Sequence, residues 1–269
     1  MTEAAAPTAP GSATAPTAAP APPARSSNLV GAGILAVWLA LGAFLLAAPR
    51  PPHVLTFAFV MVGWLLSVMV HEFSHAFIAW KAGDHTVKAK GYLDFDPRRY
   101  GALQTTLVVP ILALALGGIG FPGGAVYLRD DLMRGRAWRA AAALAGPAAT
   151  LAILVLLAGA LRLWANFGAR GDLFPALGLL AFLQAMALIL NLLPIPGFDG
   201  FNAIRPFLPR ALAAAIRKAQ ALAPLVLLAL VFFTPAGGRL FAAAAALTTA
   251  LGVPPQALQY GWNAFHFWR

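Results

Sequence analysis

The feature that most constrains the fold is a run of 21 residues, Asn28–Ala48, in which no side chain is charged. A helix of about 20 apolar residues is long enough to cross the hydrocarbon core of a membrane. Comparable apolar runs occupy Val54–Ala79, Ala137–Leu161 and Phe174–Leu193. The pattern therefore predicts a chain that crosses a membrane several times.

The composition supports this interpretation. The chain is 60% hydrophobic and 10% charged, whereas soluble domains average about 45–50% and about 25%. The absence of cysteine excludes disulfide frameworks, zinc ribbons, iron–sulfur ligation and thiol catalysis. The net charge of +10 fits loops that face an anionic leaflet rather than nucleic acid. We therefore expect an all-α polytopic membrane protein embedded in the lipid bilayer, with no nucleic-acid partner.

The chain divides into a tail and a membrane domain. Residues 1–27 are rich in alanine and proline and are predicted to be disordered, because such a segment buries too little apolar surface to fold. Residues 28–269 are predicted to form one membrane-embedded domain with about five to six transmembrane helices. Its later apolar runs are Ala219–Phe233 and the shorter Leu240–Leu251, and the aromatic residues near the end (Tyr260, Trp262, Phe265, Phe267 and Trp268) indicate an interface anchor.

One apolar run is unlike a simple helix. Leu103–Gly120 contains Pro110 and continues into the glycine- and proline-rich sequence 117–124. This chemistry is typical of a segment that dips into the membrane and returns. We expect a small re-entrant or β element over about 103–124. In the polar loop before it, Thr86–Val87 and Tyr92–Leu93 are candidate short strands.

The distribution of basic residues favours the re-entrant interpretation. If this segment crossed fully, each face would receive nine lysines and arginines, leaving out Arg269. If it dips and returns, one face receives fourteen and the other only Arg50, Arg162, Arg170 and Arg239. Basic residues are retained in the cytoplasm during insertion. The sequence thus predicts a multi-pass protein of a bacterial inner membrane, with its N-terminus and active-site loops in the cytosol.

The motif that indicates chemistry is His71-Glu72-Phe73-Ser74-His75. Histidines at i and i+4 lie on one helix face and can bind the same metal ion, and the glutamate between them can act as general base. The alternative is a helix with two packed histidines and a hydrogen-bonded glutamate. Inside an apolar span each ionisable group costs about 2–3 kcal/mol, so three of them favour a bound cation.

A catalytic zinc site needs a third protein ligand, which elimination identifies. The only other glutamate is Glu3 in the tail, and His53 lies 18 residues before His71, about 27 Å along a helix. His266 is near the end of the chain, and Asp84, His85, Asp94 and Asp96 lie in a soluble loop. Asp199, which follows the span Phe174–Leu193, remains as the ligand. Its alternative role is an ordinary Asp-Gly turn.

The sequence HEFSH in a membrane span, Ala145-Gly146-Pro147 in a later span and the segment NLLPIPGFDG at 191–200 resemble the site-2 protease family of intramembrane zinc metalloproteases. The resemblance covers a three-helix catalytic core, about residues 54–205. It implies one Zn²⁺ per chain on His71, His75 and Asp199, with Glu72 as general base. It further implies that Asn191 contacts substrate and that Gly123 and Gly124 belong to a strand that pairs with it.

Some positions depart from the family pattern. Phe198 replaces the usual leucine, and Thr150 stands where many members have asparagine, so the role of Thr150 is open. No loop is long enough for an inserted peptide-binding domain, and the segment after Phe233 is too short for a nucleotide-sensing domain. The expectation is a compact form of the family.

The predicted function is a zinc-dependent intramembrane endopeptidase that cleaves the transmembrane segments of membrane proteins, in which a zinc-bound water is the nucleophile and Glu72 the general base. One alternative is a metal transporter that uses the same histidine and aspartate ligands; five histidines in all provide no second site or path. Another alternative is a non-catalytic membrane scaffold or chaperone. The substrate, a regulatory membrane partner and homodimerisation stay open.

Overall fold

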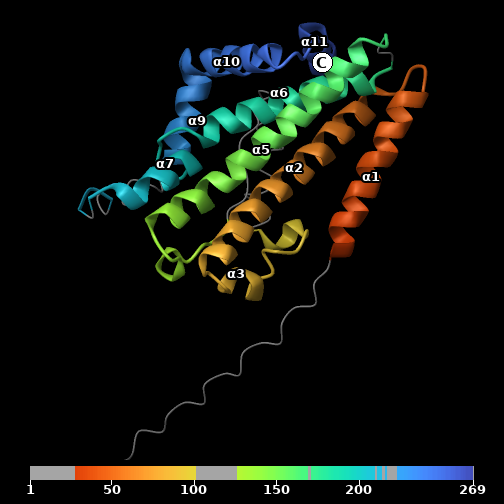
Figure 1. Ribbon diagram of the computed structural model, residues 1–269. Helices are drawn as coiled ribbons and strands as arrows, with labels where there is room; N and C mark the ends of the chain where they lie inside the picture. The colour runs from red at the N-terminus through yellow and green to blue at the C-terminus, as the bar shows by residue number, and fades with distance from the viewer. Residues whose placement is uncertain are drawn as a thin grey trace, which may run out of the picture.

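The computed structural model describes residues 28–100, 126–168, 171–209, 211–213, 216 and 223–268. Four helices in this part of the chain are long and apolar enough to cross a membrane: α1 (Asn28–Ala47), α2 (His53–Ala82), α5 (Arg136–Ala165) and α6 (Leu173–Asn191). They run side by side (Figure 1). The expectation of an all-α polytopic membrane protein is confirmed, and each predicted span matches its helix to within a few residues.

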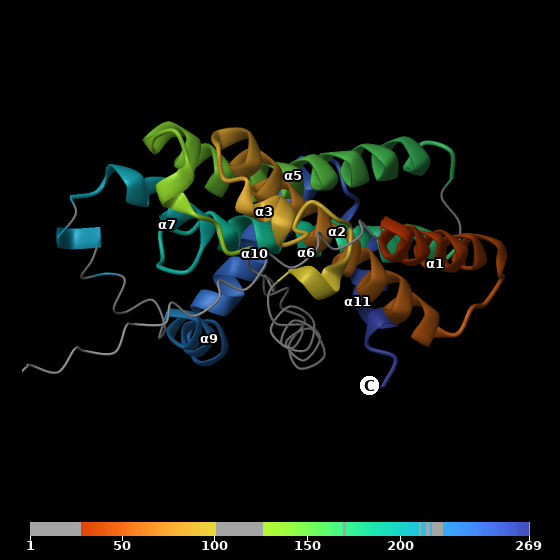
Figure 2. The ribbon, with the colours of Figure 1, turned by 90° about the horizontal axis from the view of Figure 1, so that it is seen from below.

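Helices α2, α5 and α6 form the centre of the bundle. α2 packs against α5 and α5 against α6, while α1 lies against α2. Helix α6 is the central helix, because 72% of its span is buried, whereas only 17% of the span of α1 is buried. Figure 2 shows α1 at one side of the bundle. The most enclosed side chains include Phe59, Leu154, Leu180 and Phe182, so the apolar core surrounds α6.

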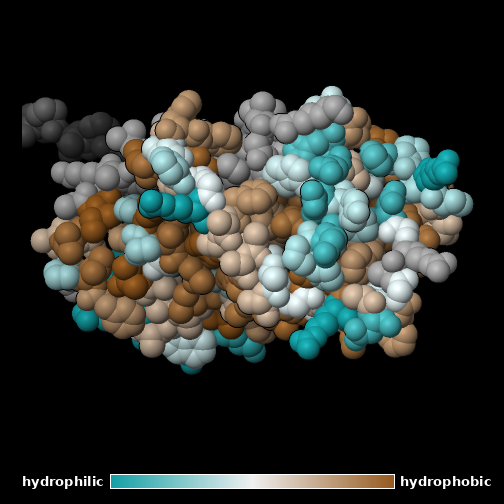
Figure 3. All heavy atoms as spheres, turned by 90° about the horizontal axis from the view of Figure 1, so that it is seen from above, coloured by the Kyte–Doolittle hydropathy of each residue, from teal (hydrophilic) through white to brown (hydrophobic). Residues whose placement is uncertain are grey.

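The outer surface is as apolar as a bilayer requires. On α1, Val37, Leu39 and Leu46 are each more than half exposed. Figure 3 shows apolar side chains over much of one face, with hydrophilic side chains gathered toward one end. Monomeric soluble proteins rarely expose large contiguous apolar patches. This surface is suited to contact with lipid.

The C-terminal part packs on the bundle through three helices, α9 (Ala223–Phe233), α10 (Ala236–Ala250) and α11 (Pro255–Phe265). Helices α10 and α11 lie against α6. The Phe265 ring is 1% exposed and lies 4.9 Å from the ring of Phe57. The interface-anchor prediction was therefore wrong for Phe265, because α2 and α6 provide an apolar surface that buries it; Tyr260 is 67% exposed.

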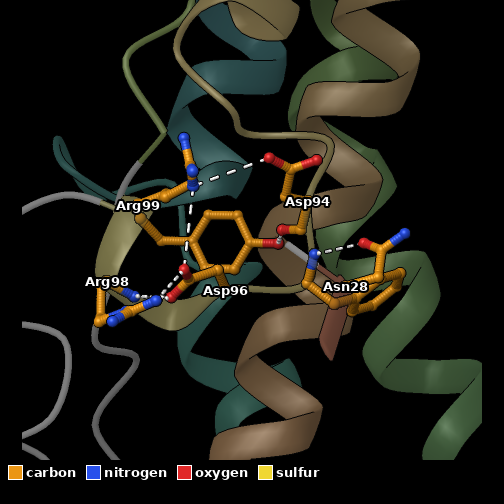
Figure 4. Close-up of polar contacts among 7 residues, drawn as sticks. Asn28, Asp94, Asp96, Arg98 and Arg99 are labelled. Carbon is orange, nitrogen blue, oxygen red and sulfur yellow. Dashed lines mark hydrogen bonds and ion pairs between the residues drawn. The ribbon is translucent and has the colours of Figure 1, made fainter. Parts of the chain in front are cut away.

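The loop that follows α2 contains two short helices, α3 (Thr86–Ala89) and η1 (Pro97–Arg99). The candidate strand Thr86–Val87 was therefore wrong: Asp84 accepts hydrogen bonds from the amide and hydroxyl of Thr86 and begins a helical turn instead. Tyr92–Leu93 lies in a turn. Figure 4 shows the end of this loop, where the side chain of Arg98 makes two hydrogen bonds to Asp96 and the amide of residue 95 approaches Asn28 at the start of α1.

Some sequence-based predictions fall on residues outside the described ranges. These are the disordered tail 1–27 and the re-entrant or β element at about 103–124, which includes Gly123 and Gly124. The total of five to six transmembrane helices stays a prediction for the same reason. No β-strand occurs among the residues that the structure describes.

Candidate metal centre

The two histidines of the motif lie one turn apart on the buried face of α2. His71 is 8% exposed and His75 is 5% exposed, and their Nε2 atoms lie 3.0 Å apart. Both rings therefore direct Nε2 to one point between α2 and the neighbouring helices. This is the convergence that the spacing predicts.

Helix α5 fixes the orientation of both rings through their other nitrogens. Nδ1 of His75 lies 2.7 Å from the carbonyl oxygen of Ala142, and Nδ1 of His71 lies 2.9 Å from Oγ1 of Thr150. A carbonyl oxygen only accepts hydrogen bonds, so Nδ1 of His75 carries the proton and Nε2 keeps a free lone pair. The same tautomer in His71, with Nδ1 donating to Thr150, leaves its Nε2 available as a ligand. Such contacts orient metal-binding histidines.

Gly146 lets α5 approach the histidines closely. A Cβ atom at this position would lie 2.3 Å from Nε2 of His75 and 2.5 Å from Nε2 of His71, which no side chain could tolerate. Pro147 follows it and removes one hydrogen bond from the helix ladder. The Gly-Pro pair therefore shapes the wall of α5 that faces the ligand atoms.

Asp199 is brought to the histidines by the segment after α6. It is the first residue of α7 (Asp199–Ile204). Gly200 sits so close to the chain that a Cβ atom there would lie 2.2 Å from the carbonyl oxygen of Leu192, which explains the Asp-Gly sequence. The carboxylate oxygens of Asp199 lie 3.2 Å from Nε2 of His71 and 3.4 Å from Nε2 of His75.

These three side chains fit a tetrahedral zinc ion. Their ligand atoms all lie within 4.8 Å of one another, and the measured separations of 3.0, 3.2 and 3.4 Å are near the edge of about 3.3 Å expected for ligands about 2.0–2.1 Å from zinc. Oδ2 of Asp199 is buried and receives no hydrogen bond.

Glu72 lies beside these ligands and is 4% exposed. Its Oε2 atom accepts a hydrogen bond of 3.1 Å from the amide of Val126. Residues 126–129 have no regular secondary structure and are held to the loop after α2, because Asp84 accepts a hydrogen bond from the amide of Arg129 and Lys90 donates one to the carbonyl of Tyr127. The segment therefore fixes one oxygen of the glutamate.

A cavity of about 20 Å³ lies beside His71 and Glu72. Its walls come from three helices: α2, α5 and α6. The lining residues are Trp64, Ser67, Val68, His71, Glu72, Thr150, Gln184, Ala187 and Asn191. Asn191, predicted to contact substrate, is the last residue of α6 and thus lies at the same cavity as Glu72.

The structure adds residues that the sequence did not single out. Thr150 was noted only as a departure, yet it holds His71. Gln184 and Trp64 line the cavity. Their spacing in the sequence could have identified both residues. Gln184 lies seven residues before Asn191, and Trp64 lies seven residues before His71, so each pair shares a helix face.

Comparison with known proteins identifies relatives with a stated activity. A protein of Mycolicibacterium smegmatis named "Putative zinc metalloprotease Rip2" is 43% identical over 212 residues, 77% of this chain and 81% of the relative. The Rip2 protein of Mycobacterium tuberculosis is 46% identical over 179 residues, 66% of this chain and 68% of the relative. YwhC of Bacillus subtilis, with the same description, is 27% identical over 66% of this chain and 82% of the relative. No family model and no solved structure matches the chain.

Proposed function

Because this chain belongs to the site-2 protease family of zinc metalloproteases, we propose that it is an intramembrane endopeptidase that cleaves the transmembrane segments of other membrane proteins. The observation that carries the proposal is the position of the candidate centre. His71, Glu72 and His75 lie within a helix long and apolar enough to cross a membrane. Ionisable groups at such a depth are costly and are typical of functional sites.

We assign the ligand roles to His71, His75 and Asp199 within a catalytic core of about residues 54–205. The ring tautomers set by Thr150 and the carbonyl of Ala142 present neutral nitrogen ligands, and Asp199 adds one negative charge. Bound zinc would supply polarisation of the scissile carbonyl and a lowered pKa for the attacking water. Three protein ligands leave the open position that a catalytic zinc site needs.

Glu72 is assigned as the general base. It removes a proton from the attacking water and passes it to the amine of the leaving peptide. The hydrogen bond from the amide of Val126 occupies Oε2 and aims the carboxylate. Gly123 and Gly124, just before this residue in sequence, are assigned to pairing with an unwound substrate backbone, and Asn191 at the cavity wall is assigned to binding the same backbone.

An apolar cavity of about 410 Å³ between α1 and the central helices supports a substrate that comes from the membrane. Its walls include Leu35 and Trp38 of α1, Leu66 of α2 and Leu157 of α5, and Ser67 lines both this cavity and the small one beside Glu72. An apolar space that reaches Ser67, four residues before His71, suits a hydrophobic segment. It is not needed for cleavage of a soluble peptide.

The cellular setting follows from the same assignment. The relatives are bacterial, and we place the protein in the bacterial cell membrane with its N-terminus and active-site loops in the cytosol. Among the described residues, one group of three metal-binding side chains occurs, so nothing there provides the second site that a metal transporter would need.

The test is cleavage of a defined single-span substrate in liposomes that contain the purified protein, with the cut located by mass spectrometry. A cut inside the apolar segment is the expected result, and cuts only in the flanking soluble parts would contradict the proposal. Glu72→Gln should keep its zinc and lose activity by a factor of about 10²–10⁴. Glu3→Gln, at the chain's other glutamate, is the matched control and should cleave normally. A scaffold would retain its function in both variants.

A further inference from the structure

Two polar groups in the bundle interior have no partner that explains their burial. Gln184 is 1% exposed and Trp64 is 3% exposed. Nε2 of Gln184 and Nε1 of Trp64 make no hydrogen bond to the part of the chain that the structure describes. A buried donor without an acceptor is unfavourable, so both groups need an explanation.

Gln184 is conspicuous on α6. The helix from Leu173 to Asn191 is otherwise made of apolar residues, glycine and proline up to Asn191. A glutamine in such a helix contributes nothing to apolar packing that leucine or methionine would not contribute better. Its position seven residues before Asn191 directs it to the same face and the same cavity.

The two groups meet at this cavity from different helices. Trp64 comes from α2 and Gln184 from α6, and both line the cavity that His71 and Glu72 also line. Seven residues of helix rise about 10 Å, so Trp64 and Gln184 form the inner end of the cavity and the motif residues form its outer end. The unpartnered donors thus lie on the membrane-interior side of the metal centre.

We propose that Trp64 and Gln184 hold one water molecule at the inner end of this cavity, which Glu72 also lines, as a resident supply for peptide hydrolysis. The volume of about 20 Å³ suits one water, which needs at least about 10–15 Å³, and is too small for a peptide group. Its role in hydrolysis rests on the proposed function.

The surrounding groups complete the hydrogen bonding of a water. The two N–H groups donate to its oxygen. The hydroxyl of Ser67 already donates to the carbonyl of Gly63 at 2.9 Å, so within the cavity it can only accept. Two donors and one acceptor give the three hydrogen bonds that are typical of a buried water. Each hydrolysis consumes one water molecule. The site lies toward the apolar interior of the membrane, which contains no water that could replace it.

The direct test is a nuclear Overhauser measurement between water and the indole N–H of Trp64 in ¹⁵N-tryptophan protein in nanodiscs. Trp64→Phe assigns the resonance by removing it. The expected result is a cross-peak to a long-lived water, which disappears in Gln184→Met because methionine keeps the length of the side chain without its amide. Absence of the cross-peak in the wild type would overturn the proposal, whether or not the protein cleaves substrate.

Kinetics give the second readout. Gln184→Met and Trp64→Phe should each lower kcat by about tenfold, the scale of one lost hydrogen bond, with KM and zinc content unchanged. A raised KM with unchanged kcat would mean that the two groups contact substrate instead. A lower Tm in both variants, with zinc lost and no water cross-peak in the wild type, would mean a structural role. Activity of the wild type separates failure of this inference from failure of the proposed protease function.

Thr56→Val is the matched control. Thr56 on α2 is fully buried and its hydroxyl also has no partner among the described residues, but it lies 15 residues before His71 and lines neither cavity. Its replacement should leave kcat, KM and the water cross-peak of Trp64 unchanged. A loss of kcat in this variant equal to that of Gln184→Met would overturn the specific role of the Trp64 and Gln184 site.

Discussion

Nδ1 of His71 on α2 lies 2.9 Å from Oγ1 of Thr150 on α5, 79 residues later in the chain. This contact joins a proposed zinc ligand to the helix that packs against it. Thr150 is 3% exposed, so solvent water cannot take the place of its hydroxyl. The orientation of the ligand therefore depends on one side chain of a neighbouring helix.

Removing this hydroxyl should weaken zinc binding. In Thr150→Val the side chain keeps its shape, but Nδ1 of His71 loses its acceptor, and we expect zinc affinity to fall roughly 10–100-fold. Competition with a chelator of known affinity measures it. Thr150→Ser keeps the hydroxyl and should bind zinc nearly as the wild type does; equal affinity in the valine variant would refute the contact's role.

Adding a side chain at Gly146 should prevent zinc binding. In Gly146→Ala the new methyl group would lie within about 2.5 Å of both ligand nitrogens, so the variant should bind no zinc, although alanine favours the helix. Zinc analysis of the purified variant tests this. Gly159→Ala on the same helix, where no atom lies within 4 Å of the new group, should retain zinc. Normal zinc in Gly146→Ala would contradict the close approach of α5.

The loop contacts of Asp84 should support Glu72 indirectly. Asp84 is fully buried and accepts hydrogen bonds from Thr86 and from the amide of Arg129, which holds the segment whose Val126 contacts Glu72. In Asp84→Ala these donors lose their acceptor, at a cost of about 1–3 kcal/mol. We expect a lower Tm and a lower kcat with zinc retained, measured by thermal unfolding and substrate cleavage.

Asp131→Ala is the control for this experiment. Asp131 pairs with the side chain of the same arginine but is 62% exposed, and exposed ion pairs contribute about 0–1 kcal/mol. Its Tm and kcat should stay near those of the wild type. If both variants behave alike, burial of Asp84 is not what holds the segment.

The sequence predicts the helices well for a simple physical reason. Uncharged runs of bilayer length have few alternatives to a transmembrane helix, and the observed bounds of α1, Asn28–Ala47, differ from the predicted run by one residue. The secondary structure of short segments is less fully determined by their own sequence. The stretch at Thr86 combines β-branched residues with an acidic residue two positions earlier, and hydrogen bonding to that acid produces a helical turn. Phe265 is buried because of packing partners far away in sequence.

Some residues of the candidate site could also be predicted from the sequence, and others could not. Spacing alone places His71 and His75 on one helix face, and Asp199 is selected because it follows an apolar span rather than lying in the loop after the motif. The contacts of Thr150 and Val126 depend on how α5 and a loop segment pack against α2. Neither has a local pattern, so the sequence could not predict them.

The central claim, that His71, His75 and Asp199 form a zinc site, is tested most directly by the zinc content of the detergent-purified protein. The account predicts about one zinc per chain in the wild type and in Glu72→Gln, and loss of zinc in Asp199→Ala. Asp172→Ala, which removes an aspartate at the opposite end of α6, should keep its zinc. A wild type without zinc, or an Asp199→Ala variant that binds a full equivalent, would contradict the account.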